Sequence, residues 1–314
     1  MSADVPQDLA SRATLHTVAK LHYEADLSQV EIARRLNIST ATVSRLLRRA
    51  RLDGIVRIEV REFQTPVDLN AKLVERLELR RAAVVDAADA GGLAGLAGPV
   101  GTFLREAGLS AGSVIAMGWG RAVREVIATG LPRLPGVVTV PATGGMQQPA
   151  PHFQIGEFVR LAAEQLGGTP RFIHAPYLPS KEAREALLRD ATLSEHLALW
   201  DRIDAAIVGI GVPHAVDPTH GRLQVTPSEQ ALVHAVGDVI RHYFDAKGNL
   251  IPWEGENRLI AVSPAQFRAV PLVIGVAASP AKAVAIRAAV RAKLINALVT
   301  DVTTARAILD LPED

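Results

Sequence analysis

Short apolar segments alternate with amphipathic ones beyond residue 81, and this alternation restricts the fold more than any other feature of the chain. The apolar runs span residues 82–85, 114–117, 137–140, 172–174, 205–210, 272–276 and 297–300. Helical spacing predicts helices at residues 100–106, 121–129, 156–166, 181–189, 282–291 and 304–309. Because buried strands that alternate with helices form parallel sheets, the pattern predicts an α/β fold with a doubly wound, mostly parallel sheet covered on both faces.

Composition removes several classes of function. The 314 residues include no cysteine, which excludes disulfides, thiolate nucleophiles and cysteine-ligated zinc. No apolar run reaches the roughly 18–20 residues that span a bilayer, and residues 1–13 lack the apolar core of a signal peptide. We therefore expect a cytoplasmic protein without a membrane partner.

Residues 1–62 follow a different pattern, which predicts three short helices and one strand. The first helix lies within residues 9–23, and Ser28 with Glu31 has the form of a capping box for the second. Ser39 can cap a third helix, whose inward stripe is Val43, Leu46, Leu47 and Ala50. Residues 56–61 alternate apolar and charged side chains, as a short strand does. The order fits a winged helix-turn-helix.

A basic segment coincides with the third helix. Six arginines and no Asp or Glu lie between Arg34 and Arg51. In a helix-turn-helix the second helix of the motif enters the major groove, with its N-terminal residues at the base edges and arginines further along on phosphates. The predicted DNA contacts are Ser39, Thr40, Thr42, Ser44, Arg45, Arg48, Arg49 and Arg51. An ordinary three-helix bundle with a solvated basic face is the alternative, and the capping box and wing favour DNA binding.

Residues 63–80 join this module to the rest of the chain. Pro66 marks a break, and Leu69, Leu73 and Leu77 form one apolar stripe on a short linker helix. The stripe could pack on a second chain or on its own domain. We expect residues 81–314 to form a separate ligand-binding domain.

Glycine-containing turns follow several predicted strands. Gly118 and Gly120 stand between a strand and a helix, an arrangement that suits an anion at the helix N-terminus. Turns at residues 143–145 and 209–211 also contain glycine, and the turn at residues 278–280, Ala-Ser-Pro, likewise follows a predicted strand. Such turns meet at the carboxyl edge of a parallel sheet, where ligands bind, although each glycine could be purely structural.

Several charged side chains allow two interpretations. Lys282 begins a predicted helix and could reach an anionic ligand or solvent. Asp245 is either a turn residue or an acceptor for sugar hydroxyls, and Asp204 and Asp238 share that ambiguity. The spacing of His214 and His220 does not fit a metal pair. We expect neither a metal, a cofactor nor a catalytic residue.

Seven motifs together resemble the sorbitol-operon-regulator (SorC) family of transcriptional regulators, from about residue 15 to residue 309. They are VSRLLRRARLDGIVRI, MGWG, PATGG, HAPYLPSKEAREALLRD, DAAIVGIG, VGDVIRHYFDAKGN and ALVTDVTTA. The resemblance implies an effector domain similar to ribose-phosphate isomerases and glucosamine-phosphate deaminases. It also implies a homodimer or homotetramer that answers to sugars, polyols or their phosphates.

The resemblance carries a set of effector-binding residues onto this chain: Gly118, Trp119, Gly120, Arg121, Ala122, Gly144, Gly145, Asp245 and Lys282. Two departures from the family pattern affect this set. Arg121 and Ala122 stand where many relatives have hydroxyl residues, and residues 277–281 replace a stretch that often holds two glycines and an acidic pair. The charge of the effector and the shape of the pocket are therefore open.

These patterns predict a sequence-specific regulator of a carbohydrate or polyol operon, with operator DNA and a sugar, polyol or sugar phosphate as partners. A reader of palindromic DNA needs at least two copies. An isomerase-like or deaminase-like enzyme with a DNA-binding appendage is the alternative, and it would need an acid/base pair that the sequence does not reveal. A non-specific DNA binder would leave the large α/β domain without a role.

Overall fold

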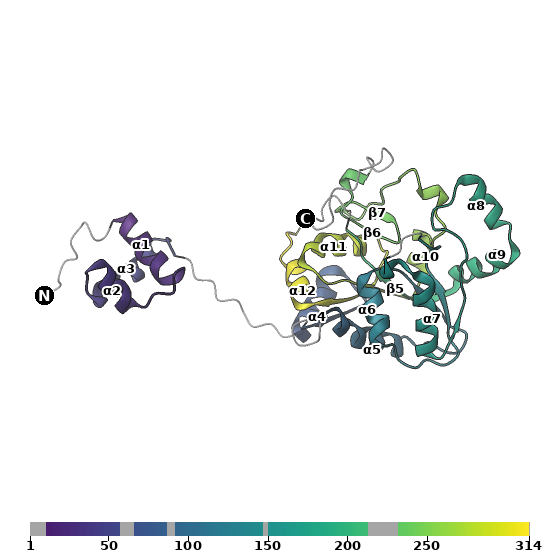
Figure 1. Ribbon diagram of the computed structural model, residues 1–314, viewed down its shortest axis with the longest axis horizontal. Coiled ribbons are helices and arrows are strands. Elements are labelled where there is room, and N and C mark those ends of the chain that lie inside the picture. Colours follow the sequence, from purple (N-terminus) through teal and green to yellow (C-terminus); the bar gives the residue numbers. More distant parts are fainter. Residues whose placement is uncertain (1–10, 57–65, 87–91, 147–149, 213–231, 314) are drawn as a thin grey trace. The chain divides into compact units, whose positions relative to one another are not determined.

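The computed structural model describes residues 11–56, 66–86, 92–146, 150–212 and 232–313 (Figure 1). The chain divides into two compact units, residues 1–63 and 64–314. No helix among the described residues is long and apolar enough to cross a membrane.

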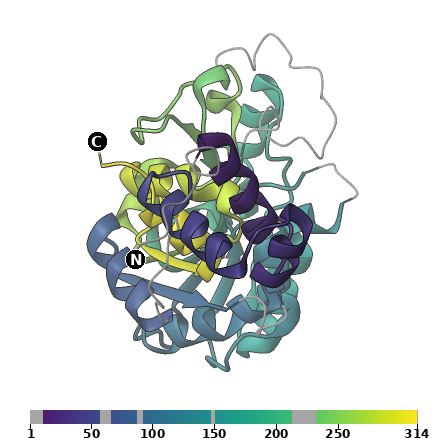
Figure 2. The ribbon, with the colours of Figure 1, turned by 90° about the vertical axis from the view of Figure 1, so that its left-hand side faces the viewer.

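The N-terminal unit contains three helices, drawn in purple in Figure 2: α1 (Arg12–Tyr23), α2 (Gln29–Leu36) and α3 (Thr40–Leu52). The predicted capping box is present, because Ser28 Oγ accepts from the Glu31 amide and the Glu31 carboxylate accepts from the Ser28 amide. Asn37 ends α2 in the left-handed conformation, with φ of 54°. The buried stripe of α3 is the predicted one. The predicted wing, from residue 57 on, lies outside the described residues.

The second unit is built on a seven-stranded sheet. Its strands are β1 (Arg81–Val85), β2 (Val114–Met117), β3 (Val138–Pro141), β4 (Thr169–Pro170), β5 (Ile203–Gly209), β8 (Leu272–Val276) and β9 (Ala297–Asp301). Their order is β1-β9-β8-β5-β2-β3-β4, and each neighbouring pair is parallel. The predicted α/β class and parallel sheet are confirmed.

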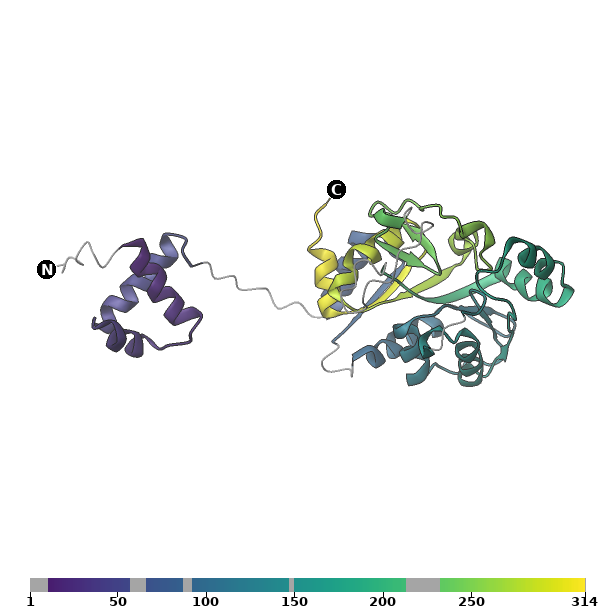
Figure 3. The ribbon, with the colours of Figure 1, turned by 45° about the horizontal axis from the view of Figure 1, so that its top comes forward.

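Helices cover both faces of this sheet, as Figure 3 shows. One face packs against α4 (Pro66–Leu77), α11 (Ala283–Arg291) and α12 (Val302–Leu309). The other packs against α5 (Ala97–Arg105), α6 (Arg121–Thr129) and α7 (Ile155–Leu166). The remaining elements include α8 (Lys181–Leu188), α9 (Ala191–Leu197), α10 (Pro264–Ala269) and the antiparallel hairpin of β6 (Gly237–Val239) and β7 (His242–Phe244).

One predicted strand is wrong in its position. Residues 172–174 form no strand, and β4 lies just before them at Thr169–Pro170. The Arg171 amide makes the last bond to β3, on Thr139 O at 2.8 Å. Phe172 and Ile173 then point into the cores on opposite faces of the sheet, which gives them the apolar pattern of a strand without its pairing.

Helix α4 packs on its own domain, which settles the two alternatives for its stripe. Leu69, Leu73 and Leu77 are buried against the core that includes β1 and α12. Asn70 Oδ1 also accepts the Val84 amide at 2.7 Å, which satisfies a backbone donor at the edge of the sheet. The linker helix is therefore part of the effector unit, and the unit begins before residue 81.

The connections of the sheet reverse direction between β2 and β5. From β2 the chain proceeds through β3 to β4 towards one edge, and from β5 through β8 to β9 towards the other. In open α/β sheets the connections that follow two such strands lead in opposite directions, and ligands bind in the crevice outside the carboxyl ends of the strands. The turns that follow β2 and β5 therefore define the place to look for a site.

Candidate functional site: a recognition helix and a sheet edge

Helix α3 presents a basic face opposite its buried stripe. Ser44, Arg45 and Arg48 are exposed and lie on this side at helical spacing. These exposed hydroxyl and guanidinium groups can meet the bases and phosphates of DNA.

Other predicted DNA contacts have local roles or flank this face. Ser39 Oγ accepts the Thr42 amide at 3.1 Å and lies 2.8 Å from Thr42 Oγ1, so Ser39 caps the helix and engages the Thr42 hydroxyl. Arg49 Nε donates to Asp53 Oδ2 at 2.9 Å. Thr40 and Arg51 are exposed at the sides. The geometry thus singles out Ser44, Arg45 and Arg48 within the larger predicted set.

The turn after β2 forms one wall of the sheet-edge site. The Gly118 amide donates to Ile207 O at 2.8 Å, and Trp119 is buried. Gly120 precedes α6 with φ of 128°, a conformation that favours glycine. No side chain caps α6, and Arg121 is exposed at its first position while Ala122 is buried. The start of α6 can accept an anion.

Lys282 joins the turn after β8 to the turn after β5. Its Nζ donates to Ile210 O at 2.8 Å. Burial and then the nearby Arg121 guanidinium lower the pKa of Lys282, and Asp238 opposes them. Asp238 bridges to Gly211, with backbone bonds of 2.9 and 3.2 Å in the two directions. Arg121 and Asp238, which lie far apart in sequence, thus both lie near Lys282 at the switch point.

The β6–β7 hairpin adds side chains that the sequence analysis missed. Arg241, in its turn, donates to Tyr243 Oη and lies over the Tyr177 ring, with its Cζ 5.7 Å from the centroid. The Tyr177 ring in turn meets Trp119 edge-on at 5.7 Å. Burial lowers the pKa of Arg241, but Tyr243, Asp238 and Tyr177 raise it above its ordinary value. Aromatic rings and a charged guanidinium therefore lie together beside the turn after β2.

The two glycines after β3 have a packing role. A Cβ on Gly144 would lie 2.6 Å from Ala175 O and 2.8 Å from Pro176 O, so a larger residue does not fit. The Gly145 amide donates to Ala175 O at 2.8 Å, and the Tyr177 amide donates to Gly145 O at 3.0 Å. These bonds hold Tyr177 at the edge of the sheet.

Several residues that the sequence analysis weighed fall away from this site or outside the described chain. Asp245 Oδ1 accepts the Lys247 and Asn249 amides, both at 2.9 Å, and the Asn249 side-chain hydrogen bond lowers the pKa of Asp245. It is a turn residue, and the same turn contacts Arg291 at the far end of α11. Asp204 accepts the Val114 amide at 2.8 Å. His214 and His220 lie outside the described residues.

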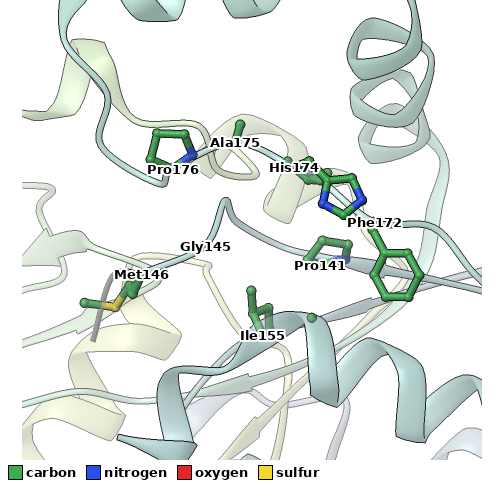
Figure 4. Close-up of a pocket in the computed structure, with 10 residues that line it drawn as sticks. Pro141, Gly145, Met146, Ile155, Phe172, His174, Ala175 and Pro176 are labelled. Carbon is green, nitrogen blue, oxygen red and sulfur yellow. The ribbon is translucent and has the colours of Figure 1, made fainter. Parts of the chain in front are cut away.

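Two cavities flank the cluster. One of about 380 Å³ is lined by Ile155 at the start of α7 and by Phe172 and His174 beyond β4 (Figure 4). The other, of about 450 Å³, is lined in part by Arg121 and His152. Neither cavity is lined by Lys282 or Arg241.

Ser279, beside Lys282, is held in a strained backbone conformation. Its φ of 151° lies where glycine is favoured, and its amide donates to Thr304 Oγ1 at 2.7 Å. Strain of this kind costs about 1–3 kcal/mol.

We expect Ser279→Gly to raise the free energy of unfolding by about 1 kcal/mol, after the entropy cost of glycine is subtracted. Thermal denaturation should show this as a melting temperature higher by about 2–4 °C. Ser279→Ala, which loses the same hydroxyl without relieving the backbone, should not raise it; an equal gain in both variants would contradict the argument.

Comparison with known families covers both units. The family model of the sugar-binding domain (Sugar-bind) matches residues 61–310, and that of winged helix-turn-helix DNA-binding domains matches residues 20–57. The sorbitol operon regulator of Klebsiella pneumoniae is 29% identical over 93% of this chain and 96% of its own length. The deoxyribonucleoside regulator of Bacillus subtilis (strain 168) is 28% identical over 93% of this chain and 96% of its own length.

A solved structure agrees in both fold and extent. The full-length sorbitol operon regulator SorC from Klebsiella pneumoniae superposes with a TM-score of 0.71 at 27% identity, covering 95% of this chain and 99% of that one. The match spans the helix-turn-helix and the α/β domain together, and the matched relatives are regulators by name. The chain is therefore no isomerase or deaminase with an appendage, and it belongs to the SorC family of DNA-binding transcriptional regulators with a sugar-binding domain.

Proposed function

We propose that this regulator controls a carbohydrate or polyol catabolic operon, and that a sugar, polyol or sugar phosphate bound at the switch point sets its affinity for operator DNA. The observation that carries the proposal is the convergence of Arg121, which follows β2, and Lys282, which follows β8 and binds Ile210 O just after β5. Aromatic faces suit sugar rings, and amides at a helix start suit phosphate. Asp238 supplies an acceptor for hydroxyl groups.

The DNA-binding part of the proposal assigns roles along α3. Ser44 and Arg45 read base edges, and Arg48, Arg49 and Arg51 contact phosphates, with Ser39, Thr40 and Thr42 at the N-terminal end. A palindromic operator needs two such helices, so the protein acts as a homodimer or homotetramer. A regulator that works on operator DNA in this way acts in the bacterial cytoplasm.

Helix α4 is the coupling element in this proposal. The Ser279 amide at the site is bonded to Thr304 on α12, and α12 packs on α4. Arg76 on α4 also donates to Leu311 O, just beyond α12, at 3.0 Å. A ligand that moves the turn around Ser279 would thus shift α12 and, through it, the helix from which the DNA-binding unit extends. Energetic coupling of this kind changes operator affinity by about 5- to 150-fold.

A thermal-shift screen of sugars, polyols and their phosphates tests the effector site. A ligand at 100 times its Kd stabilises the folded protein by about 2.7 kcal/mol, which is a clear shift in melting temperature. We expect Lys282→Met to abolish the shift for the ligand that stabilises the wild-type protein. Lys181→Met, on α8, is the matched control and should keep it. A ligand that stabilises Lys282→Met as strongly as the wild type binds at another place.

A further inference from the structure

The cavity beyond the carboxyl ends of β3 and β4 is lined by none of the basic residues at the switch point. Its volume of about 380 Å³ is within the range of small-molecule sites. The walls come from the end of β3, the start of α7 and the segment that follows β4. No lysine, arginine, aspartate or glutamate occurs among the described residues that line it. The cavity is therefore chemically unlike the proposed sugar site.

Hydrogen bonds to the backbone fix the walls of this cavity. The Gly145 amide donates to Ala175 O at 2.8 Å, which joins the segment after β3 to the segment after β4. Nδ1 of His196 lies 2.7 Å from Phe172 O and fixes the second of these segments to α9. Because the walls are already in place, a ligand binds without the cost of ordering them.

The side chains determine which kind of molecule fits. The rings of Phe172 and His174 lie beside each other, with centroids 6.0 Å apart and an angle of 35° between their planes (Figure 4). Such rings offer faces and edges against which another aromatic ring packs. Met146 and Ile155 add further apolar surface. A sugar would lose hydrogen bonds of its hydroxyl groups against these walls, and a charged group would meet no opposite charge among the described lining residues.

The cavity also has one hydrogen-bonding side chain and an accessible edge. His174 is the one polar side chain among the described lining residues, and it is exposed. A neutral imidazole can donate one hydrogen bond and accept another. Gly156, the second residue of α7, is exposed as well, and a Cβ at this position would meet nothing within 4 Å. A small molecule can therefore enter between His174 and the start of α7.

We propose that this cavity is a second ligand site, which takes a small, uncharged molecule with an aromatic ring and one hydrogen-bonding group. The ring packs against Phe172 and the apolar walls, and the polar group meets His174. Burial of the apolar surface of the ring drives binding. The site is separate from the switch point, so one chain holds this ligand and a sugar effector at the same time.

Methyl NMR of the full-length protein, labelled at methionine, tests this assignment. The chain has three methionines, and comparison with Met146→Leu identifies the signal of Met146. The probe is indole, which has an aromatic ring and one N–H group, and acetamide, which has no ring, is the control ligand. We expect indole to shift the Met146 signal progressively to saturation, whereas acetamide at the same concentration leaves it in place. No shift with indole, or an equal shift with acetamide, overturns the proposal.

Gly156→Leu tests whether the probe occupies the cavity. The leucine side chain takes up space that the ring needs, so indole binding should weaken by at least about tenfold. The melting temperature should not fall, because leucine favours a helix more than glycine does and no neighbour obstructs its Cβ. Indole affinity equal to that of the wild type, or a melting temperature lower by several degrees, contradicts the proposal.

Gly98→Leu is the matched control. Gly98 is likewise the exposed second residue of a helix, α5, and a Cβ there would meet nothing within 4 Å. Gly98 does not line the cavity, so this variant should bind indole as the wild type does. An equal loss of indole binding in both variants would place the probe outside the cavity and overturn the assignment.

Two further measurements separate the proposed ligand from other occupants. His174→Ala removes the hydrogen-bonding group and should weaken indole binding by roughly two- to tenfold, the usual net contribution of one hydrogen bond. An unchanged affinity contradicts the assigned role of His174. Light scattering should give Gly156→Leu the same oligomeric state as the wild type. A change in that state would show that the cavity receives a second copy of the chain, and would overturn the proposal.

Discussion

Leu73→Ala is expected to lower the free energy of unfolding of the effector unit by about 2–5 kcal/mol, the usual cost of truncating a buried leucine. Leu73 is fully buried on the face of α4 that packs against β1 and α12. Urea denaturation followed by tryptophan fluorescence measures this unit selectively, because Trp119, Trp200 and Trp253 all lie in it.

The neighbouring residue provides the control. Lys72 is exposed on the same helix, and Lys72→Ala should change stability by less than about 0.5 kcal/mol. Leu73→Glu buries a carboxylate in the core and should unfold the unit, so it cannot serve as a test of coupling alone. A Leu73→Ala protein as stable as wild type would show that α4 is not packed as described.

Arg45→Ala is expected to weaken binding to the operator by about 1–3 kcal/mol, or roughly 5- to 150-fold, and to relax preference at one base pair. Arg45 lies near the N-terminal end of α3 on the exposed side opposite the buried stripe. Fluorescence anisotropy with operator variants at each position measures both effects.

Arg48→Ala separates base reading from phosphate contact. It should weaken binding to all sequences alike and reduce the slope of log affinity against log salt by about one. Lys20→Ala removes the same charge from α1, where Lys20 is paired with Glu24, and should have a much smaller effect. If Arg45→Ala and Lys20→Ala weakened binding equally and without change in base preference, α3 would not be the recognition helix.

Local signals predicted much of this architecture. Ser28 and Ser39 cap helices where the sequence places them, because capping depends on residues only three positions apart. The glycines after β2 and the lysine after β8 follow buried strands, and parallel strands bring their carboxyl ends to one edge whatever the loops between them. That is why Arg121 and Lys282 could be expected near each other.

Other parts of the site depend on contacts that sequence spacing does not encode. Asp245 and Asp238 looked alike as acidic turn residues, but Asn249 holds Asp245 in its own turn, whereas pairing with Gly211 holds Asp238 at the sheet edge. Arg241 was missed because its turn lacks the Asn-Gly signal of a two-residue hairpin. The one sign of a hairpin in the sequence is that two short segments with apolar residues, 237–239 and 242–244, flank Ile240 and Arg241.

The measurement that tests the central claim most directly is the affinity of the full-length protein for its operator and for a scrambled duplex, with and without the ligand from the thermal-shift screen. The account predicts at least about 10³-fold preference for the operator at physiological salt, and a change of about fivefold or more in operator affinity when the ligand is present. Equal affinity for the two duplexes, or an operator affinity that a bound ligand leaves unchanged, would contradict it.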